Sequence, residues 1–187
     1  MKQKNYEKLR ILDVGCGNNK YKEEEAKVYG IDVGKTKAVD KIWDAEKEKI
    51  PYPDNYFDKV VCNSALQEIA DVNRVITEIW RVSKSKARVI ITVPYFRSWC
   101  AFFEQNKSFF RLDSFGYYTQ IYGNWKSTAR FKLIKNKFNM IFGEHSKLKF
   151  FRILYPVVNL PYLSYILQNY LPIIIPEGLK FELEVVK

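Results

Sequence analysis

Two short stretches near the N-terminus carry residue types that bind nucleotides. The first, RILDVGCGNNK, is an apolar run that ends in Asp13 and then breaks into Gly15 and Gly17. Its apolar residues are typical of a buried strand, and its glycines remove side chains where the backbone turns tightly and admits a ligand. A second apolar run ends in Asp32, fifteen residues after Gly17, near the spacing of about 20 residues at which such folds hold a ribose. These residues predict a nucleotide-type cradle at the end of a strand.

The cradle lacks the third glycine of the dinucleotide fingerprint GxGxxG, because Lys20 stands in its place. This argues against a nicotinamide or flavin enzyme. The acid-x-Gly-x-Gly stretch instead resembles the first motif of the class I S-adenosylmethionine-dependent methyltransferases, in particular their methyltransferase type 11-like members. The resemblance continues in order through Asp32, through Trp43-Asp44-Ala45, and through the lead PYPDNYFD into the fourth strand, and it covers residues 11–94.

The resemblance implies S-adenosylmethionine as the cofactor and assigns residues to it. Asp13 would act on the methionine ammonium, Asp32 would accept both ribose hydroxyls, and Asp44 would accept from the adenine amino group. Asn63 lies at the strand end that faces the sulfonium in this family. Two alternatives stay open, because Asp44 also fits as the cap of a turn and Asn63 as the plain end of a strand. The expected cofactor-binding residues are Asp13, Gly15, Cys16, Gly17, Asp32, Val33, Asp44, Ala45 and Asn63.

No histidine stands where this family often places a general base. Its members often read HVLEH after the fourth strand, whereas this chain reads SALQE, and the one histidine, His145, is predicted to lie on a surface turn. The remaining candidates for a proton acceptor are Glu68, Tyr95 and Asp113. An acceptor group that is already basic or acidic enough needs no such residue.

Composition indicates one globular domain. The chain has 187 residues, 47% of them hydrophobic and 28% charged, which is enough to bury a single substantial core. The three cysteines are far apart without a CxxC pair, so we expect no metal site and a reducing, cytoplasmic compartment. The first ten residues have no apolar core and predict no signal peptide. The net charge of +10 is spread along the chain and is typical of a lysine-rich solvated surface.

Strands and helices must alternate to position these residues. Apolar runs predict strands over 11–14, 27–33, 39–43, 59–63 and 88–93, with a sheet-edge strand over 131–138 and a one-faced strand over 179–186. Apolar residues at helical spacing predict a helix over 72–82 with Asp71 as its N-cap. Shorter helices are expected over 21–27 and over 112–122, the latter capped by Asp113 or Ser114. This order predicts an α/β, doubly wound, Rossmann-like sheet of seven mostly parallel strands with an antiparallel final strand.

Two segments beyond the fifth predicted strand are expected to cover the substrate. They are residues 95–125 and 140–176 of one domain spanning 1–187. Prolines cut the apolar stretch 150–175 into pieces shorter than the roughly 20 residues of a membrane span, so no transmembrane segment is predicted. Between Pro161 and Pro172, apolar residues at helical spacing form one stripe. This stripe fits a helix packed on the sheet, a lid over the substrate or a membrane-surface contact. Its members are Leu163, Ile166, Leu167, Tyr170 and Leu171.

The predicted function is therefore methyl transfer from S-adenosylmethionine to a small-molecule or lipid-like acceptor. RNA methylation is an alternative that is not favoured, because no NPPY-type motif stands at Asn63-Ser64-Ala65, no Pro-Cys pair supplies a nucleophile, and no RNA-binding appendage is present. A non-catalytic partner subunit that binds the cofactor is the other alternative, which the missing histidines favour.

Overall fold

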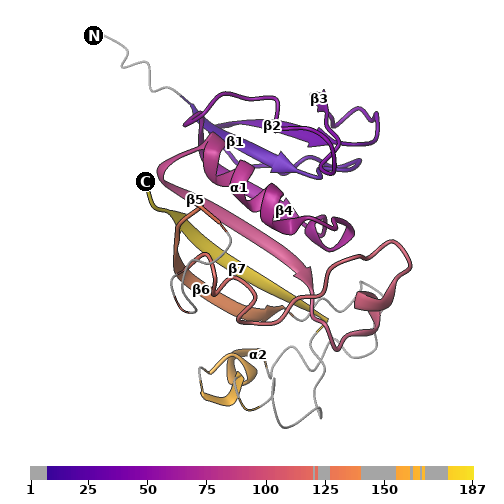
Figure 1. Ribbon diagram of the computed structural model, residues 1–187, viewed down its shortest axis with the longest axis vertical. Helices are drawn as coiled ribbons and strands as arrows, with labels where there is room; N and C mark the ends of the chain where they lie inside the picture. Colours follow the sequence, from indigo (N-terminus) through magenta and orange to yellow (C-terminus); the bar gives the residue numbers. More distant parts are fainter. Residues whose placement is uncertain are drawn as a thin grey trace.

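Seven strands form one sheet in the part of the chain that the structure describes (Figure 1). The computed structural model describes residues 8–119, 121, 127–139, 155–160, 162–164, 166 and 177–187. The strands lie in the order β3-β2-β1-β4-β5-β7-β6. Their bounds are β1 Leu9–Val14, β2 Ala26–Asp32, β3 Lys41–Ile42, β4 Phe57–Asn63, β5 Ser83–Pro94, β6 Phe131–Asn139 and β7 Gly178–Val185.

The first five strands are parallel, and β7 runs antiparallel to both β5 and β6. The mostly parallel α/β sheet with an antiparallel final strand is confirmed, and so is the edge position of β6. The strand order reverses at β1, since β2 lies on one side of it and β4 on the other. In such sheets ligands bind outside the carboxyl ends of the strands at the reversal. The structure thus predicts a ligand site where β1 and β4 end.

Helix α1, Val72–Val82, packs on one face of the sheet in the connection from β4 to β5 (Figure 1). The predicted cap is confirmed, because the Asp71 side chain accepts a hydrogen bond of 3.0 Å from the Arg74 amide. The predicted apolar face is also confirmed, with Val75, Ile76 and Ile79 buried.

Asp71→Ala should destabilise the protein by about 1 kcal/mol, because the amide of the first helical turn loses its acceptor. Asp71→Asn keeps a side-chain oxygen and should recover most of that loss. Urea denaturation of the three proteins checks this, and equal stability of the alanine and asparagine variants would contradict the capping role.

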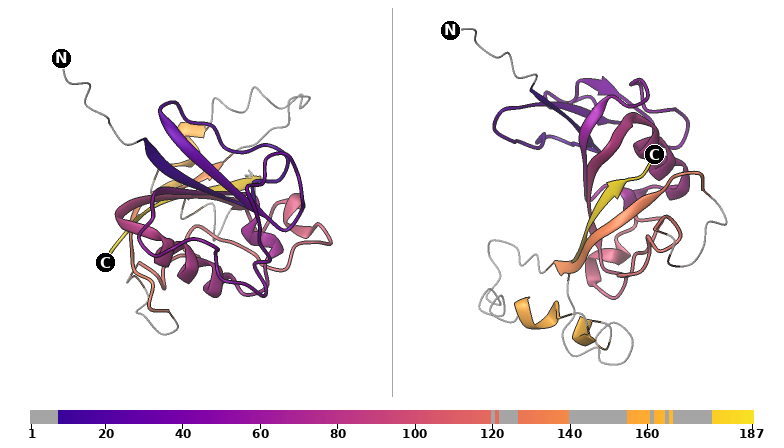
Figure 2. Two further views of the ribbon diagram at one scale, coloured as in Figure 1. Left: turned by 90° about the horizontal axis from the view of Figure 1, so that it is seen from above. Right: turned by 90° about the vertical axis from the view of Figure 1, so that its left-hand side faces the viewer.

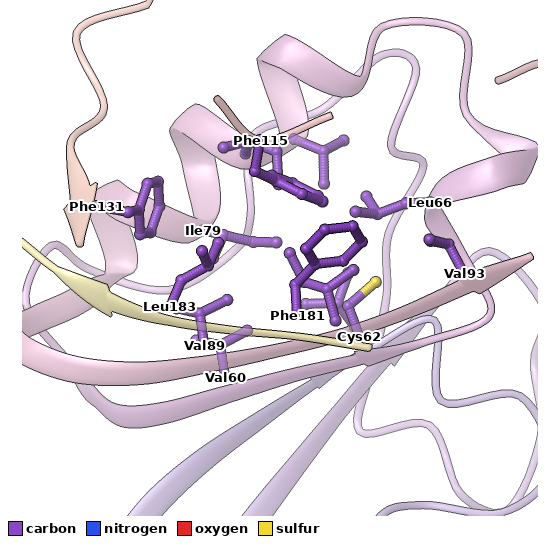
Figure 3. Packing of buried hydrophobic residues seen from close by; sticks show 14 of the residues in the cluster. Val60, Cys62, Leu66, Ile79, Val89, Val93, Phe115, Phe131, Phe181 and Leu183 are labelled. Carbon is purple, nitrogen blue, oxygen red and sulfur yellow. The ribbon is translucent and has the colours of Figure 1, made fainter. Parts of the chain in front are cut away.

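The hydrophobic core lies between α1 and the alternate residues of β1, β4, β5 and β7 (Figure 3). Val60, Val89 and Leu183 point from three neighbouring strands to the same side, where Ile79 of α1 and Phe115 of the following segment meet them. All five are at most 3% exposed. Because the period of a strand is two residues, this face is apolar while the opposite face of β7 carries charged side chains.

A network around Arg81 fixes the connection between β3 and β4, which lines the candidate site. The Arg81 guanidinium donates to Glu78 at 2.8 Å, to Asp54 at 2.6 Å and to the Ile50 carbonyl at 2.9 Å. The Ile50 amide donates to Glu78 at 2.8 Å. Burial alone would raise the pKa of Glu78, but the hydrogen bonds from Arg81 and Ile50 outweigh burial and lower it.

Because the folded-state pKa of Glu78 is lowered, its contribution to stability is present above the unfolded value of about 4.5 and is lost as the pH falls. Glu78→Gln should therefore reduce stability by roughly 1–2 kcal/mol at neutral pH, with a smaller difference from wild type near pH 3. Denaturant titrations at several pH values measure this. The exposed Glu24→Gln is the control, and an equal loss at every pH would contradict the assignment.

The helix expected over 21–27 is wrong. Residues 21–25 form a loop with a turn at Glu24 and Glu25, and Glu25 has a φ of 60°. Specific side-chain contacts hold the loop: the Tyr21 amide donates to Asp13 at 2.7 Å, and Lys59 pairs with Glu23. With β2 beginning at Ala26, too few residues remain for a stable helix.

The helix expected over 112–122 is also wrong in the described residues, which run to 119 and include 121. Residues 112–119 form successive turns, in which the Gly116 amide donates to Asp113 and the Tyr118 amide to Phe115. These bonds span three residues rather than the four of an α-helix. Phe115 is drawn into the core against Phe181, with ring centroids 4.6 Å apart, and this packing overrides the weak helical pattern.

The apolar segment near the C-terminus is described only in part. It contains α2, Tyr155–Val158, and helical residues at 162–164 and 166. Figure 2 shows α2 beyond the end of β6, and the Phe138 amide of β6 donates to Asn159 Oδ1 at 2.7 Å. Of the predicted stripe, Leu163 and Ile166 are described, whereas Leu167, Tyr170 and Leu171 lie outside the described residues, as does His145. Within the described ranges, no helix has the length and apolarity to cross a bilayer.

Candidate cofactor site

A cavity of about 590 Å³ lies beyond the carboxyl ends of β1, β2 and β3. This volume falls within the range of roughly 300–1,000 Å³ that small-molecule sites occupy. Five of the residues predicted to bind the cofactor line it: Gly15, Asp32, Val33, Asp44 and Ala45. The candidate base Glu68 lines it as well. The structure therefore brings together, at the reversal of strand order, residues from four separate segments of the sequence.

The glycine loop after β1 requires its glycines. Gly15 and Gly17 have φ values of +70° and +54°, in the left-handed region that side chains disfavour. A Cβ on Gly15 would come within 2.3 Å of the Ala65 Cβ, whereas a Cβ on Gly17 would meet nothing within 4 Å. The amides of Gly15 and Cys16 both donate to the Ile31 carbonyl, at 2.8 and 3.2 Å. The loop is thus packed between β2 and the segment after β4.

Asp32 holds the cavity wall through both carboxylate oxygens. Its Oδ2 accepts from the Gly17 amide and its Oδ1 from the Gly34 amide, each at 2.9 Å. A carboxylate offers about four acceptor positions, so each oxygen keeps one for a ligand hydroxyl. The two backbone bonds fix the direction in which the free positions point.

Asp13 faces the loop between β1 and β2 and does not line the cavity. It is 3% exposed, and its Oδ2 accepts from the Tyr21 amide. Burial raises the pKa of Asp13, although the hydrogen bond from Tyr21 and the charge of Lys20 oppose this. The side chain thus anchors the start of the loop.

The rim of the cavity is built by the segment after β3 together with Lys107. Asp44 accepts from the Glu46 amide at 2.9 Å and pairs with Lys47 at 3.0 Å, and these two contacts lower its pKa. It thus caps a turn, as one alternative foresaw, while also lining the cavity. Glu46 accepts from the Ala70 amide at 2.9 Å and from Lys107 at 3.1 Å. This ion pair joins two residues of the cavity wall, Glu46 and Lys107.

Cys16, Gly17 and Asn63 stand beside the cavity without lining it. Burial, together with the charges of Asp13 and Asp32, raises the pKa of the Cys16 thiol to about 11. Asn63 is exposed and its Oδ1 accepts from Thr92 at 3.1 Å, so its side chain is joined to the neighbouring strand.

The three candidate proton acceptors do not line one cavity together. Glu68 is exposed at the edge of the cavity. Tyr95 is 2% exposed between Phe96 and Phe138, its hydroxyl has no hydrogen-bond partner among the described residues, and burial raises its pKa. Asp113 pairs with Arg111 at 3.2 Å. It lines neither this cavity nor a second cavity that lies beside it. Only Glu68 is placed where a reacting group of a ligand in the cavity would lie.

Sequence reasoning missed Gln67 and Glu177, which line a second cavity beside the first. The sequence could have pointed to Gln67, because it stands within the SALQE stretch that departs from the family pattern. No sequence feature pointed to Glu177, because it follows a long apolar run and lies far from the predicted site residues in the sequence. In the described residues no group of three or more His, Cys, Asp or Glu side chains is arranged to hold a metal ion.

Comparison with known proteins finds similar proteins by sequence and by fold. Residues 12–91 match the model of the methyltransferase domain family, and this segment contains the glycine loop, Asp32, Asp44 and Glu68. Over these residues the chain is similar to the methyltransferases, and this match supports S-adenosylmethionine as its cofactor. Among curated proteins none matches the chain.

Solved structures share the fold over nearly the whole chain. A methyltransferase from Archaeoglobus fulgidus is 14% identical, with 94% of this chain and 86% of that chain covered and a TM-score of 0.54. A phosphoethanolamine N-methyltransferase from Haemonchus contortus, in complex with S-adenosylmethionine, is 15% identical, and the match covers 96% of this chain and 49% of that chain with a TM-score of 0.55. The cyclase SpnF is 18% identical, and the match covers 96% of this chain and 74% of that chain with a TM-score of 0.57. At these identities the likeness concerns the fold.

Proposed function

We propose that the protein transfers the methyl group of S-adenosylmethionine to a small-molecule or lipid-like acceptor. The observation that carries the proposal is the adjoining pair of cavities at the reversal of strand order. One contains Gly15, Asp32 and Asp44, and the other shares Glu68 and Gln105 with it. A transferase needs two such sites in contact, because the acceptor atom must approach the methyl group in line.

The lining of the first cavity fits the cofactor. We assign the ribose hydroxyls to the free acceptor positions of Asp32 and the adenine to the wall of Val33, Asp44 and Ala45. The open backbone at Gly15 would receive the methionine part. Asp13, Cys16 and Gly17 would act through the shape of the loop, and Asn63 would act at the strand end beside the sulfonium. Apolar residues supply the remaining wall: Val14, Trp43, Ala65 and Ile69.

The cofactor supplies an activated methyl group, so the chain has to bind, align and exclude water. We propose that residues 1–187 form one domain in which segments 95–125 and 140–176 cover the substrate. Support for the first segment comes from Gln105 and Lys107, which reach the cofactor cavity. The Lys107 and Ser108 amides both donate to the Gln67 carbonyl, at 2.7 and 3.0 Å, and hold the segment there. The free thiols of Cys16, Cys62 and Cys100 fit a cytoplasmic protein.

Calorimetry with S-adenosylhomocysteine and with NAD tests the cofactor assignment. We expect micromolar binding of S-adenosylhomocysteine and no binding of NAD, because the third fingerprint glycine is replaced by Lys20. Tight NAD binding without a response to S-adenosylhomocysteine would refute it.

Salt dependence separates a small acceptor from RNA. RNA binding would weaken steeply as salt rises, because lysines displace condensed counterions, whereas an apolar acceptor would bind with little change. We expect the second behaviour when a hydrophobic small-molecule panel and a mixed RNA pool are compared at low and moderate salt. Binding of cofactor without turnover of any acceptor would favour the role of a partner subunit.

A further inference from the structure

We propose that the second cavity binds the methyl acceptor and that this acceptor is an amine carried on an apolar or aromatic body. The inference rests on the proposed function and names its substrate class. The cavity, about 450 Å³ in volume, lies beyond the carboxyl ends of β4 and β5 and the start of β7. Because it shares Glu68 and Gln105 with the cofactor cavity, a molecule in one touches the boundary of the other.

Gln67 lines this cavity and carries a buried side-chain acceptor without a hydrogen-bond partner among the described residues. The residue is 5% exposed, and its Oε1 has no partner among the described residues. The amide cannot be reversed without loss, because its Nε2 donates to the Ser64 carbonyl at 2.7 Å. A buried acceptor without a partner is costly in free energy. A ligand that donates an N–H or O–H bond to Oε1 would remove that cost.

Two carboxylates give the cavity a negative charge. Glu177 and Glu68 line it, and no lysine or arginine does among the described residues, although the chain as a whole carries a net charge of +10. Burial raises the pKa of Glu177, while a hydrogen bond from the Trp99 side chain opposes that shift. The ligand chemistry that meets two carboxylates and an amide oxygen is a hydrogen-bond donor that can carry positive charge, which is an amine.

Aromatic rings supply the apolar part of the cavity. Trp99 and Phe103 line it and contact each other edge to face, with ring centroids 5.2 Å apart. They are 68% and 44% exposed, and adjoining exposed apolar side chains can mark a ligand-binding groove. Ring faces bind flat apolar groups and also attract cations. An amine on an aromatic or aliphatic body would cover them.

The transfer is balanced without a further reactant. The neutral amine nitrogen forms a bond to the methyl carbon with its lone pair as the carbon–sulfur bond breaks, the electron pair passes to sulfur, and one proton leaves the nitrogen for Glu177 or water. The hydrogen bonds from the nitrogen to Gln67 and Glu177 would fix the direction of its lone pair.

The test measures binding and methylation of phenethylamine, with phenylpropionic acid of similar size as the comparison, in the presence of S-adenosylhomocysteine or S-adenosylmethionine. We expect the amine to bind and to be methylated, and the acid to do neither. Glu177→Gln should weaken amine binding roughly tenfold, as expected when an ionic hydrogen bond becomes neutral, and should leave S-adenosylhomocysteine affinity unchanged. Gln67→Leu should also weaken binding of the amine.

The control variant is Glu104→Gln. Glu104 is an exposed glutamate next to Phe103 in the sequence, and it lines neither cavity. This variant should change neither the affinity for the amine nor the affinity for S-adenosylhomocysteine. Thermal denaturation checks that each variant is folded. If wild type binds S-adenosylhomocysteine but binds the acid as well as the amine, or if Glu177→Gln leaves amine binding unchanged, the inference is wrong and the proposed function stands. If S-adenosylhomocysteine itself does not bind, the proposed function fails first.

Discussion

Replacing Gly15 by alanine should destabilise the protein by roughly 3 kcal/mol and abolish measurable binding of S-adenosylhomocysteine. Two terms contribute. The φ of +70° is unfavourable for an L-residue with a side chain by about 1–2 kcal/mol, and the contact of 2.3 Å with the Ala65 Cβ adds an overpacking term of about 1–3 kcal/mol. Neither the glycine loop nor the segment after β4 can yield without moving backbone, because the Gly15 amide is bonded to Ile31 and the Ser64 amide to Thr92.

Two further variants separate these terms. Gly17→Ala has a similar φ of +54° and open space around the new methyl group, so it should lose only about 1–2 kcal/mol. The double variant Gly15→Ala with Ala65→Gly removes the clash and should recover the packing term alone. Guanidinium denaturation and calorimetry measure both quantities. Equal losses in Gly15→Ala and Gly17→Ala would show that the close approach to Ala65 is not rigid.

Replacing Asp32 by alanine should weaken S-adenosylhomocysteine binding by roughly 2 kcal/mol, or about 30-fold. The ribose would lose two charge-assisted acceptors, and the amides of Gly17 and Gly34 would lose the carboxylate that now fixes them at 2.9 Å. Asp32→Asn keeps one oxygen acceptor and should fall between wild type and alanine.

Asp113→Ala is the matched control, since that carboxylate lies outside both cavities and pairs with Arg111. It should leave the affinity for S-adenosylhomocysteine unchanged. If Asp32→Ala lowers the melting temperature sharply and leaves the affinity unchanged, Asp32 is purely a structural residue. Isothermal calorimetry with differential scanning calorimetry on the same samples distinguishes the two roles.

Local patterns were enough to predict the strands, helix α1 and the glycine loop. The apolar runs that end in Asp13 and Asp32 became β1 and β2, and the helical spacing after Asp71 became α1. These predictions hold because backbone geometry fixes the strand and helix periods, so the positions of the apolar residues reveal them, and because a turn with positive φ favours glycine. The two helix predictions were wrong because contacts outside the local pattern decide the conformation of those segments. These contacts join Tyr21 with Asp13 and Phe115 with Phe181.

The cofactor residues lie close to one another in sequence, which is why the resemblance to a family identified them. In a parallel sheet each strand delivers the residue at its carboxyl end to the same edge, so a motif after each strand predicts a shared site. The sequence alone therefore determined the fold class, the cofactor and the position of the glycine loop.

Only the tertiary structure placed Gln67, Trp99 and Glu177 around one cavity. They come from three connections separated by up to 110 residues, and they meet because β7 returns antiparallel beside β5 and carries Glu177 back to the ends of β4 and β5. No local period or motif encodes such a meeting, since it depends on which strand ends the fold makes adjacent. Local sequence thus specified much of the lining of the first cavity, while the packing of distant connections decided the lining of the second.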